Sequence, residues 1–185
     1  MNHRTLFVML LSILALTGCK QEVLPKPRAF LRLEYPEAKK EILQTDHFRF
    51  QYNQMAKIKA KNTQSLTLDY PGMKGTIFIN YKPVAGNLVK LLGDAQKFSY
   101  EHVVKADAIE PKVFENRTDR VYGMFYAVSG DAASQAQFYV TDSTKHFVTG
   151  SLYFYAKPNY DSIYPAAVYL QNDILTIMET LRWKD

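Results

Sequence analysis

Apolar residues alternate with polar ones in several short segments, and this pattern constrains the fold of the chain more than any other feature. A period of two places successive side chains on opposite faces of a β-strand, so that one face can be buried. Residues 47–52, 64–70 and 76–82 show this period, with alternate positions filled by Phe48, Phe50 and Tyr52, by Leu66, Leu68 and Tyr70, and by Ile77, Ile79 and Tyr81. We expect these segments to be strands of a sheet with one buried face.

Short turns between these segments indicate antiparallel pairing. Pro71 and Gly72 suit the two central positions of a type II turn, which predicts a hairpin between the second and third segments. Further strands are expected at residues 112–115, 120–128, 134–141 and 146–156, the last two joined by a polar turn. The expected core residues are Phe48, Phe50, Leu66, Leu68, Ile77, Ile79, Phe138, Val140, Leu152 and Phe154.

Two other segments repeat apolar residues every three or four positions, which predicts amphipathic helices. The first follows Asn87, a favourable N-cap residue, and carries the stripe Leu88, Leu91, Leu92, Ala95, Phe98 and His102. The second closes the chain, with Asp161 or Ser162 as its expected cap and with the stripe Ala167, Leu170, Ile174, Ile177, Met178 and Leu181.

Consecutive strands joined by short turns, with helices set apart, predict an α+β fold. We expect an antiparallel sheet of about six to seven strands packed with two main helices. The order of the elements is similar to that of the PsbP/Mog1-like sandwich, an analogy of topology that carries no function.

The first nineteen residues predict export and lipid attachment. Residues 6–16 are uncharged and mostly apolar, which fits a signal-peptide core and falls short of the ~20 residues of a membrane-spanning helix. Leu16, Thr17, Gly18 and Cys19 then form a bacterial lipobox. We predict a cleaved signal peptide at 1–18, a lipidated N-terminus and extended tether at 19–27, and a single α+β domain at 28–185. Acyl chains on Cys19 would bind membrane lipid.

The remaining charge and cysteine content narrow the possible functions. Cys19 is the only cysteine, which excludes an intramolecular disulfide and, once it is acylated, a Cys–His nucleophile. Lys57, Lys59 and Lys61 alternate with other residues close to Arg49. In an exported protein, a solvated loop or an edge strand kept charged against aggregation explains them better than nucleic-acid binding. We expect no nucleic-acid partner.

No catalytic, cofactor or metal site is predicted. His47, His102 and His146 fall on separate elements and lack the close spacing typical of zinc ligands. The chain contains neither a G-x-S-x-G nucleophile motif nor a glycine-rich phosphate-binding motif. We therefore expect a protein that is not an enzyme.

The chain is rich in tyrosine, with 13 residues, and three of them could form one surface. Tyr139 falls on one predicted strand, and Tyr153 and Tyr155 fall on the next. Either these rings pack beneath the C-terminal helix, or they form an open platform that binds a small ligand or a glycan.

Residues 24–36 resemble the start of the mature chain in the gliding-motility lipoprotein D family, GldD, of Bacteroidetes. That family has a lipobox, a P-K-P-[KR] segment, an aromatic residue, an arginine, an apolar–acidic pair and a proline. The matching residues here are Pro25, Lys26, Pro27, Arg28, Phe30, Arg32, Glu34 and Pro36. Ala29 stands where glycine is expected, and Leu33 with Glu34 replaces an Ile-Asp type of pair.

The resemblance implies a non-enzymatic envelope lipoprotein required for gliding and linked to type IX secretion, whose partners are other envelope proteins of these systems. Only Cys19 transfers from the family as a defined site. The expected location is the outer membrane, facing the periplasm, and a surface-exposed form stays open because Lys20, Gln21 and Glu22 are faintly similar to a surface-export signal. The alternative function is an envelope lipoprotein that binds a small ligand or a glycan through its tyrosine-rich face.

Overall fold

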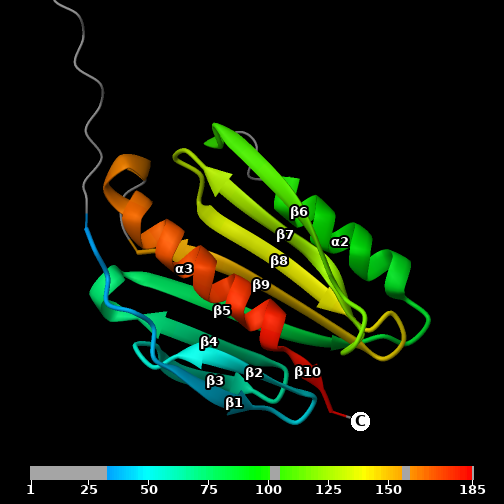
Figure 1. Cartoon of the computed structure of the whole chain (residues 1–185). Coiled ribbons are helices and arrows are strands. Elements are labelled where there is room, and N and C mark those ends of the chain that lie inside the picture. Colours follow the sequence, from blue (N-terminus) through cyan, green and yellow to red (C-terminus); the bar gives the residue numbers. More distant parts are fainter. Residues whose placement is uncertain (1–32, 101–104, 156–158, 185) are drawn as a thin grey trace, which may run out of the picture.

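Two antiparallel sheets and two α-helices make up the structure, a computed structural model that describes residues 33–100, 105–155 and 159–184 (Figure 1). The larger sheet has seven strands in the order β3-β4-β5-β9-β8-β7-β6. Its strands are β3 (Lys57–Asn62), β4 (Ser65–Tyr70), β5 (Gly75–Pro83), β6 (Ala108–Asn116), β7 (Val121–Ser129), β8 (Ser134–Thr141) and β9 (His146–Phe154). This arrangement confirms the predicted α+β fold with an antiparallel sheet.

A second sheet of three short strands lies beside the first. It has the order β1-β2-β10 and consists of β1 (Lys40–Gln44), β2 (Phe48–Asn53) and β10 (Arg182–Trp183). The sequence pattern predicted β2 but neither β1 nor β10. Ile42 in β1 is exposed, so the strand has no buried alternating face to signal it, and β10 has only two residues.

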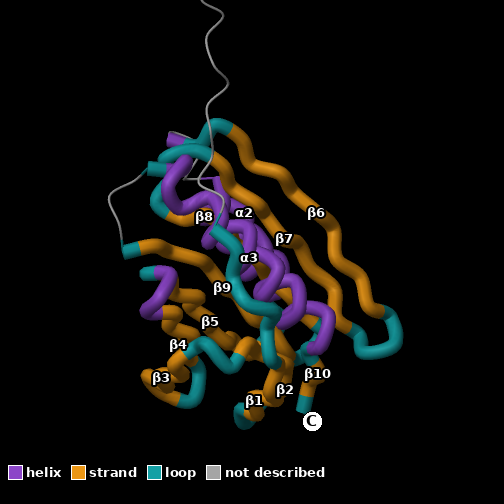
Figure 2. The backbone as a smooth tube through the Cα atoms, turned by 60° about the vertical axis from the view of Figure 1, so that its left-hand side comes forward, coloured by secondary structure: helices purple, strands orange, loops and turns teal. Residues whose placement is uncertain are grey.

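The helices α2 (Leu88–Tyr100) and α3 (Tyr160–Thr180) lie on opposite faces of the larger sheet. Figure 2 shows α3 in front of the sheet, running across it toward β2 and β10. Both helices were predicted. Helix α2 begins directly after Asn87 as expected, whereas α3 begins at Tyr160, before the predicted caps.

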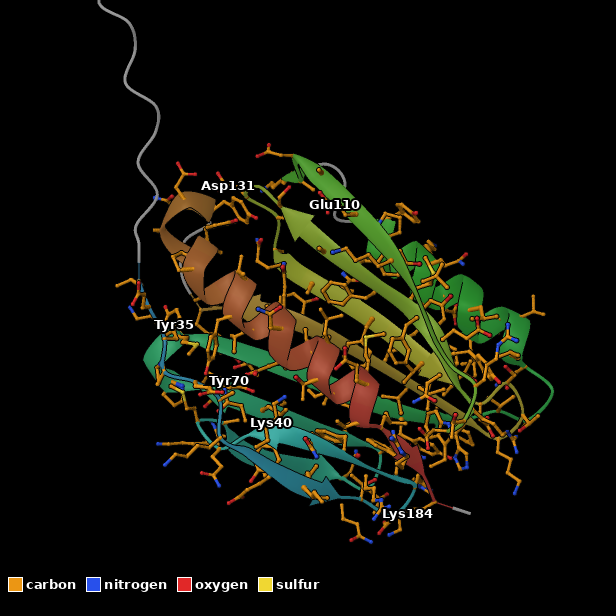
Figure 3. The ribbon with its side chains drawn as sticks, viewed as in Figure 1. Tyr35, Lys40, Tyr70, Glu110, Asp131 and Lys184 are labelled. Atoms are coloured by element: carbon orange, nitrogen blue, oxygen red, sulfur yellow. The ribbon has the colours of Figure 1, made fainter. Side chains whose placement is uncertain are left out.

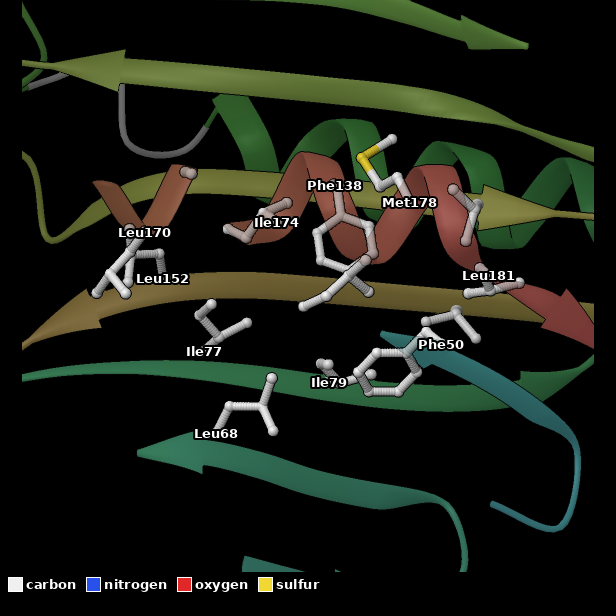
Figure 4. Packing of buried hydrophobic residues seen from close by; sticks show 14 of the residues in the cluster. Phe50, Leu68, Ile77, Ile79, Phe138, Leu152, Leu170, Ile174, Met178 and Leu181 are labelled. Atoms are coloured by element: carbon white, nitrogen blue, oxygen red, sulfur yellow. The ribbon is translucent and has the colours of Figure 1, made fainter. Parts of the chain in front are cut away.

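The main core lies between the larger sheet, α3 and β2 (Figure 4). Nine of the ten predicted sheet residues are buried in it, and the tenth, Phe154, is half-buried. The predicted stripe of α3 is buried throughout. Phe138 packs its ring over Gly150 on the neighbouring strand, where a side chain at position 150 would collide with the ring. The glycine therefore leaves room for the large ring of Phe138 above the neighbouring strand.

The structure corrects two local predictions and decides between the two interpretations of a third segment. Residues Pro71–Met73 form a short 3-10 helix rather than a type II turn, because the left-handed residue is Lys74, with φ 53°, and not Gly72. Residues 57–62 form the edge strand β3, one of the two interpretations of that lysine-rich segment. Neither Asp161 nor Ser162 caps α3. The carboxylate of Asp131 accepts the main-chain N–H of Tyr160 at 2.8 Å instead.

Candidate functional site

Alternation along the central strands gives the larger sheet two different faces. One face carries Ile77, Ile79 and Leu152 into the main core beneath α3. The opposite face, here called the α2 face, carries Thr76, Phe78, Asn80, Thr149, Ser151, Gln137 and Tyr139. Helix α2 packs on only part of this face, over β8. The α2 face therefore has an apolar part that α2 covers and a polar part that α2 does not cover.

The covered part is a small second core beneath α2. Leu91 of the helix packs with Tyr126, Tyr139 and Phe147 of the sheet. The rings of Tyr139 and Phe147 are stacked, with centroids 5.7 Å apart and planes within 9° of parallel. The sequence predicted the helix stripe but not this separation into two cores, because periodicity does not tell which face of the sheet each helix covers.

A cavity of about 280 Å³ opens where α2 ends its cover of the sheet. Its aromatic side consists of Tyr139 and Phe147, and its polar side consists of Asn80, Gln137, Thr149 and Ser151. Lys82 of β5 and Asp94 of α2, both exposed, also border it. The cavity thus joins two stacked rings to a row of uncharged amides and hydroxyls.

Gln137 is the unusual member of this row. The residue is only 2% exposed, yet its Nε2 atom has no hydrogen-bond partner among the residues that the structure describes. A buried donor left without a partner costs about 1–3 kcal/mol of stability. A glutamine within a strand that is buried on both faces is the sequence signal that could have identified this position. The sequence analysis did not single out Gln137.

The three tyrosines singled out from the sequence do not form one platform. Tyr139 is buried, but beneath α2 rather than beneath the C-terminal helix. Tyr153 is half-buried and makes an edge contact with Phe78, and Tyr155 is 65% exposed. Burial raises the pKa of the Tyr139 and Tyr153 hydroxyls, so both rings stay neutral near pH 7.

A second polar cluster lies at the end of the sheet where β10 joins β2. His146 is buried, shares a 3.1 Å hydrogen bond between its Nδ1 and the Tyr81 hydroxyl, and stacks on Trp183 with centroids 5.1 Å apart. His47 stacks on the same Tyr81 ring at 4.0 Å. The structure therefore brings two of the three histidines considered as zinc ligands, His47 and His146, to one tyrosine. The third, His102, lies outside the described residues.

Asp142 organises the turn beside His146. Its Oδ1 accepts the main-chain N–H groups of Thr144, Lys145 and His146 at 2.8–2.9 Å, and Arg120 lies 3.6 Å from its Oδ2. Burial alone would raise the pKa of Asp142, but these hydrogen bonds outweigh it and lower the pKa to about 2. The carboxylate thus serves as a structural acceptor.

Within the described residues no group of three or more His, Cys, Asp or Glu side chains is placed to hold a metal ion.

A third polar group is buried between α3 and β2. Asn53 donates through Nδ2 to Asp173 and to the Tyr169 hydroxyl, at 3.0 Å each. Burial raises the pKa of Asp173, and the hydrogen bond from Asn53 offsets only part of this effect. Burial also raises the pKa of the neighbouring Tyr70 hydroxyl. Figure 3 shows Tyr70 on the same side of the molecule as Tyr35, where the described chain begins, and far from Lys184 near its other end.

The structure also contains a larger, more apolar hollow of about 540 Å³ between β1 and the hairpin of β3 and β4. Leu43, Phe48, Ile58, Leu66 and Ile79 contribute its apolar lining. Most of these side chains also belong to the main core or pack against it. The hollow is therefore an open margin of the core rather than a separate cluster of reactive groups.

The family comparison agrees with the sequence resemblance. The model of a protein family described as gliding motility lipoprotein GldD matches residues 20–183, nearly the whole chain. The match places this α+β sandwich among the envelope-associated lipoproteins of gliding motility. Within that class, the chain belongs to the GldD family. A search of curated proteins found no match.

Cys19, the predicted lipidation site, lies outside the described residues. Among the residues that the structure does describe, no helix combines the length and apolar composition needed to cross a membrane.

Proposed function

We propose that this chain is a non-catalytic component of the gliding-motility apparatus that also supports type IX secretion, held at the membrane by acylated Cys19. The match of the GldD family to residues 20–183 is the observation that carries the proposal. The match spans both sheets and both helices, so it concerns the whole described fold rather than a shared leader peptide.

The proposed anchor is supported by two features of the chain. The lipobox precedes Cys19 directly, and the family match begins at the next residue, Lys20. The segment that would lead from the anchor is fastened to the sandwich, because the Tyr169 hydroxyl donates to the carbonyl of Pro36 at 2.8 Å. A membrane-bound Cys19 would therefore hold the domain close to the lipid surface through a short tether, residues 19–27.

A role without catalysis is supported by how the polar clusters are used. Asp142 accepts three main-chain N–H groups, and His146 is stacked against Trp183. The low pKa of Asp142 makes it a poor general base near pH 7. These groups stabilise the fold, and we infer that the protein acts through contacts with other envelope proteins of the gliding and secretion systems.

The placement we propose is the outer membrane, with the domain facing the periplasm. Protease treatment of intact cells tests the orientation, because a periplasmic domain is protected until the outer membrane is opened. Degradation in intact cells would overturn this placement and favour a surface-exposed form.

Deletion in the native organism tests the function. We expect loss of colony spreading and of secreted cargo, both restored by the wild-type chain but not by Cys19→Ala. Val23→Ala, a change four positions after Cys19 and outside the segment Lys20–Glu22, should restore both and serves as the matched control. Normal spreading in the deletion strain would overturn the motility role, and normal secretion would overturn the secretion link.

A further inference from the structure

We propose that the cavity between α2 and the α2 face binds an uncharged, polyhydroxylated ring, the chemistry of a single neutral pyranose. This inference goes beyond the proposed function and does not depend on it. The cavity is formed by strands β5, β8 and β9 and by α2, apart from the histidine cluster at the end of the sheet.

The unpartnered amide of Gln137 is the first observation. Its Nε2 atom is a hydrogen-bond donor, buried and without a partner in the described part of the chain, and Gln137 lines the cavity. Native structures keep few such groups, so a ligand oxygen that reaches this buried amide from the cavity would supply the missing partner. A ligand hydroxyl or ring oxygen would accept this N–H.

The other lining residues define the chemistry of the ligand. Asn80, Thr149 and Ser151 add an amide and two hydroxyls, all uncharged. The stacked rings of Tyr139 and Phe147, on the same face of the sheet, supply an apolar part of the lining. A pyranose has this same division, because its hydroxyls radiate from the edge of the ring while its C–H bonds make an apolar face. A cavity of about 280 Å³ suits one ring, since the pockets that bind drug-sized ligands measure roughly 300–1,000 Å³.

The charges at the rim favour a neutral ligand. Lys82 and Asp94 border the cavity and carry opposite charges, so their long-range fields largely cancel. Neither an anionic nor a cationic ligand gains a net attraction from this pair. A zwitterionic amino acid would match these two opposite charges, so the binding experiment includes amino acids as competing probes.

Saturation-transfer NMR and calorimetry on the full-length protein measure binding directly. The protein is kept in a detergent without a sugar headgroup, and the probes are mannose, galactose, glucose and N-acetylglucosamine, with glycine and alanine as amino-acid probes. We expect saturable binding of at least one sugar and none of the amino acids. Binding of the amino acids alone, or of no probe, would overturn the proposal.

Matched variants tie the binding to the cavity. Gln137→Met and Thr149→Val should each weaken sugar binding by about tenfold or more, because each removes one polar partner. Thr67→Val, on the same face of the sheet but outside the cavity, should leave binding unchanged. An equal loss in Thr67→Val, or no loss in Gln137→Met, would overturn the assignment.

Thermal unfolding separates a ligand-binding amide from a structural one. Gln137→Met removes the unpartnered donor and should raise the melting temperature while it weakens binding. Gln135→Met is the matched control on the same strand, because Gln135 donates to the carbonyls of Gly130 and Ala132 at 3.2 and 2.9 Å. It should lower the melting temperature. A lower melting temperature for Gln137→Met as well would mean that its amide is structural, and would overturn the proposal.

A last comparison distinguishes a free sugar from the terminal residue of an envelope glycan. A methyl glycoside has its anomeric position blocked, as in a glycan chain. Equal binding of the glycoside and the free sugar would assign the site to a chain terminus, and loss of binding by the glycoside would assign it to a free sugar. Either result supports the neutral-pyranose chemistry.

Discussion

The hydroxyl of Tyr169 in the middle of α3 donates a hydrogen bond of 2.8 Å to the main-chain carbonyl of Pro36, 133 positions earlier in the chain. The ring of Tyr35 packs against the same tyrosine, with centroids 5.2 Å apart. Tyr169 also accepts the side-chain N–H of Asn53. One residue of the closing helix thus holds the segment that would connect the domain to its anchor.

Replacement of Tyr169 by phenylalanine should lower the free energy of unfolding by about 1–2 kcal/mol. The change removes two hydrogen bonds, while Asn53 keeps its bond to Asp173. Urea unfolding followed by circular dichroism measures the effect. Tyr155→Phe makes the same chemical change at an exposed ring and should have almost no effect, so equal losses in the two variants would contradict this role for Tyr169.

Truncation of Ile77 to alanine should cost about 2–5 kcal/mol of stability. The side chain is fully buried beneath α3, and its removal leaves a cavity that the neighbouring residues fill only in part. Ile42→Ala is the matched control, because Ile42 is 64% exposed on β1, and it should cost less than about 1 kcal/mol. Similar losses in the two variants, measured by urea unfolding, would argue against the described core.

Asp142 should make the stability of the protein depend on pH in the acid range. Its pKa of about 2 in the folded chain lies below the value of about 3.9 in an unfolded chain. The stabilisation is therefore complete above about pH 4 and is lost as the pH falls through about 2. Asp142→Asn should cost about 1–2 kcal/mol at pH 7 and almost nothing near pH 2. A constant difference across this range would contradict the mechanism.

Asp173 should change the pH dependence of stability in the direction opposite to that of Asp142. Burial raises its pKa, so the folded chain holds the proton more tightly than the unfolded chain, and stability rises as the pH falls toward 4. Asp173→Asn keeps an oxygen to accept the N–H of Asn53 and removes the buried charge. We expect this variant to be at least as stable as the wild type at pH 7. Its stability should no longer increase as the pH falls toward 4. A large loss of stability at pH 7 would show that the charged form is needed.

Cys19 should carry the lipid in the mature protein. Mass spectrometry of the mature N-terminus should find a diacylglyceryl cysteine at this position, because the lipobox ends there. Cys19→Ala should accumulate in the unprocessed form, whereas Lys20→Ala should be processed normally. A soluble mature form without lipid would contradict the prediction.

Much of the fold follows from local patterns in the sequence. The period of two in residues 64–70 and 76–82 predicted the hairpin of β4 and β5, and the apolar stripe of α3 is buried as expected. The resemblance in residues 24–36 led to the same family as the match over residues 20–183. These features are local because the burial of one face imposes its period on the residues of each element.

The start of α3 shows why other features could not be predicted locally. Asp161 and Ser162 have suitable side chains for a cap, yet the acceptor for the first helical N–H is Asp131, 29 positions away. Strand β10 likewise has two residues and exists because Arg182 and Trp183 pair with β2. Both depend on which segments meet in space.

The sequence by itself determined the α+β class, the predicted export signal and the family. The tertiary structure alone decided that α2 and α3 cover opposite faces of the sheet, which separates Tyr139 from the main core and leaves Gln137 beside a cavity. Periodicity specifies that a side chain is buried, because burial depends on the local face of an element. Which partner it meets depends on contacts between residues far apart in the chain, and no local pattern records them.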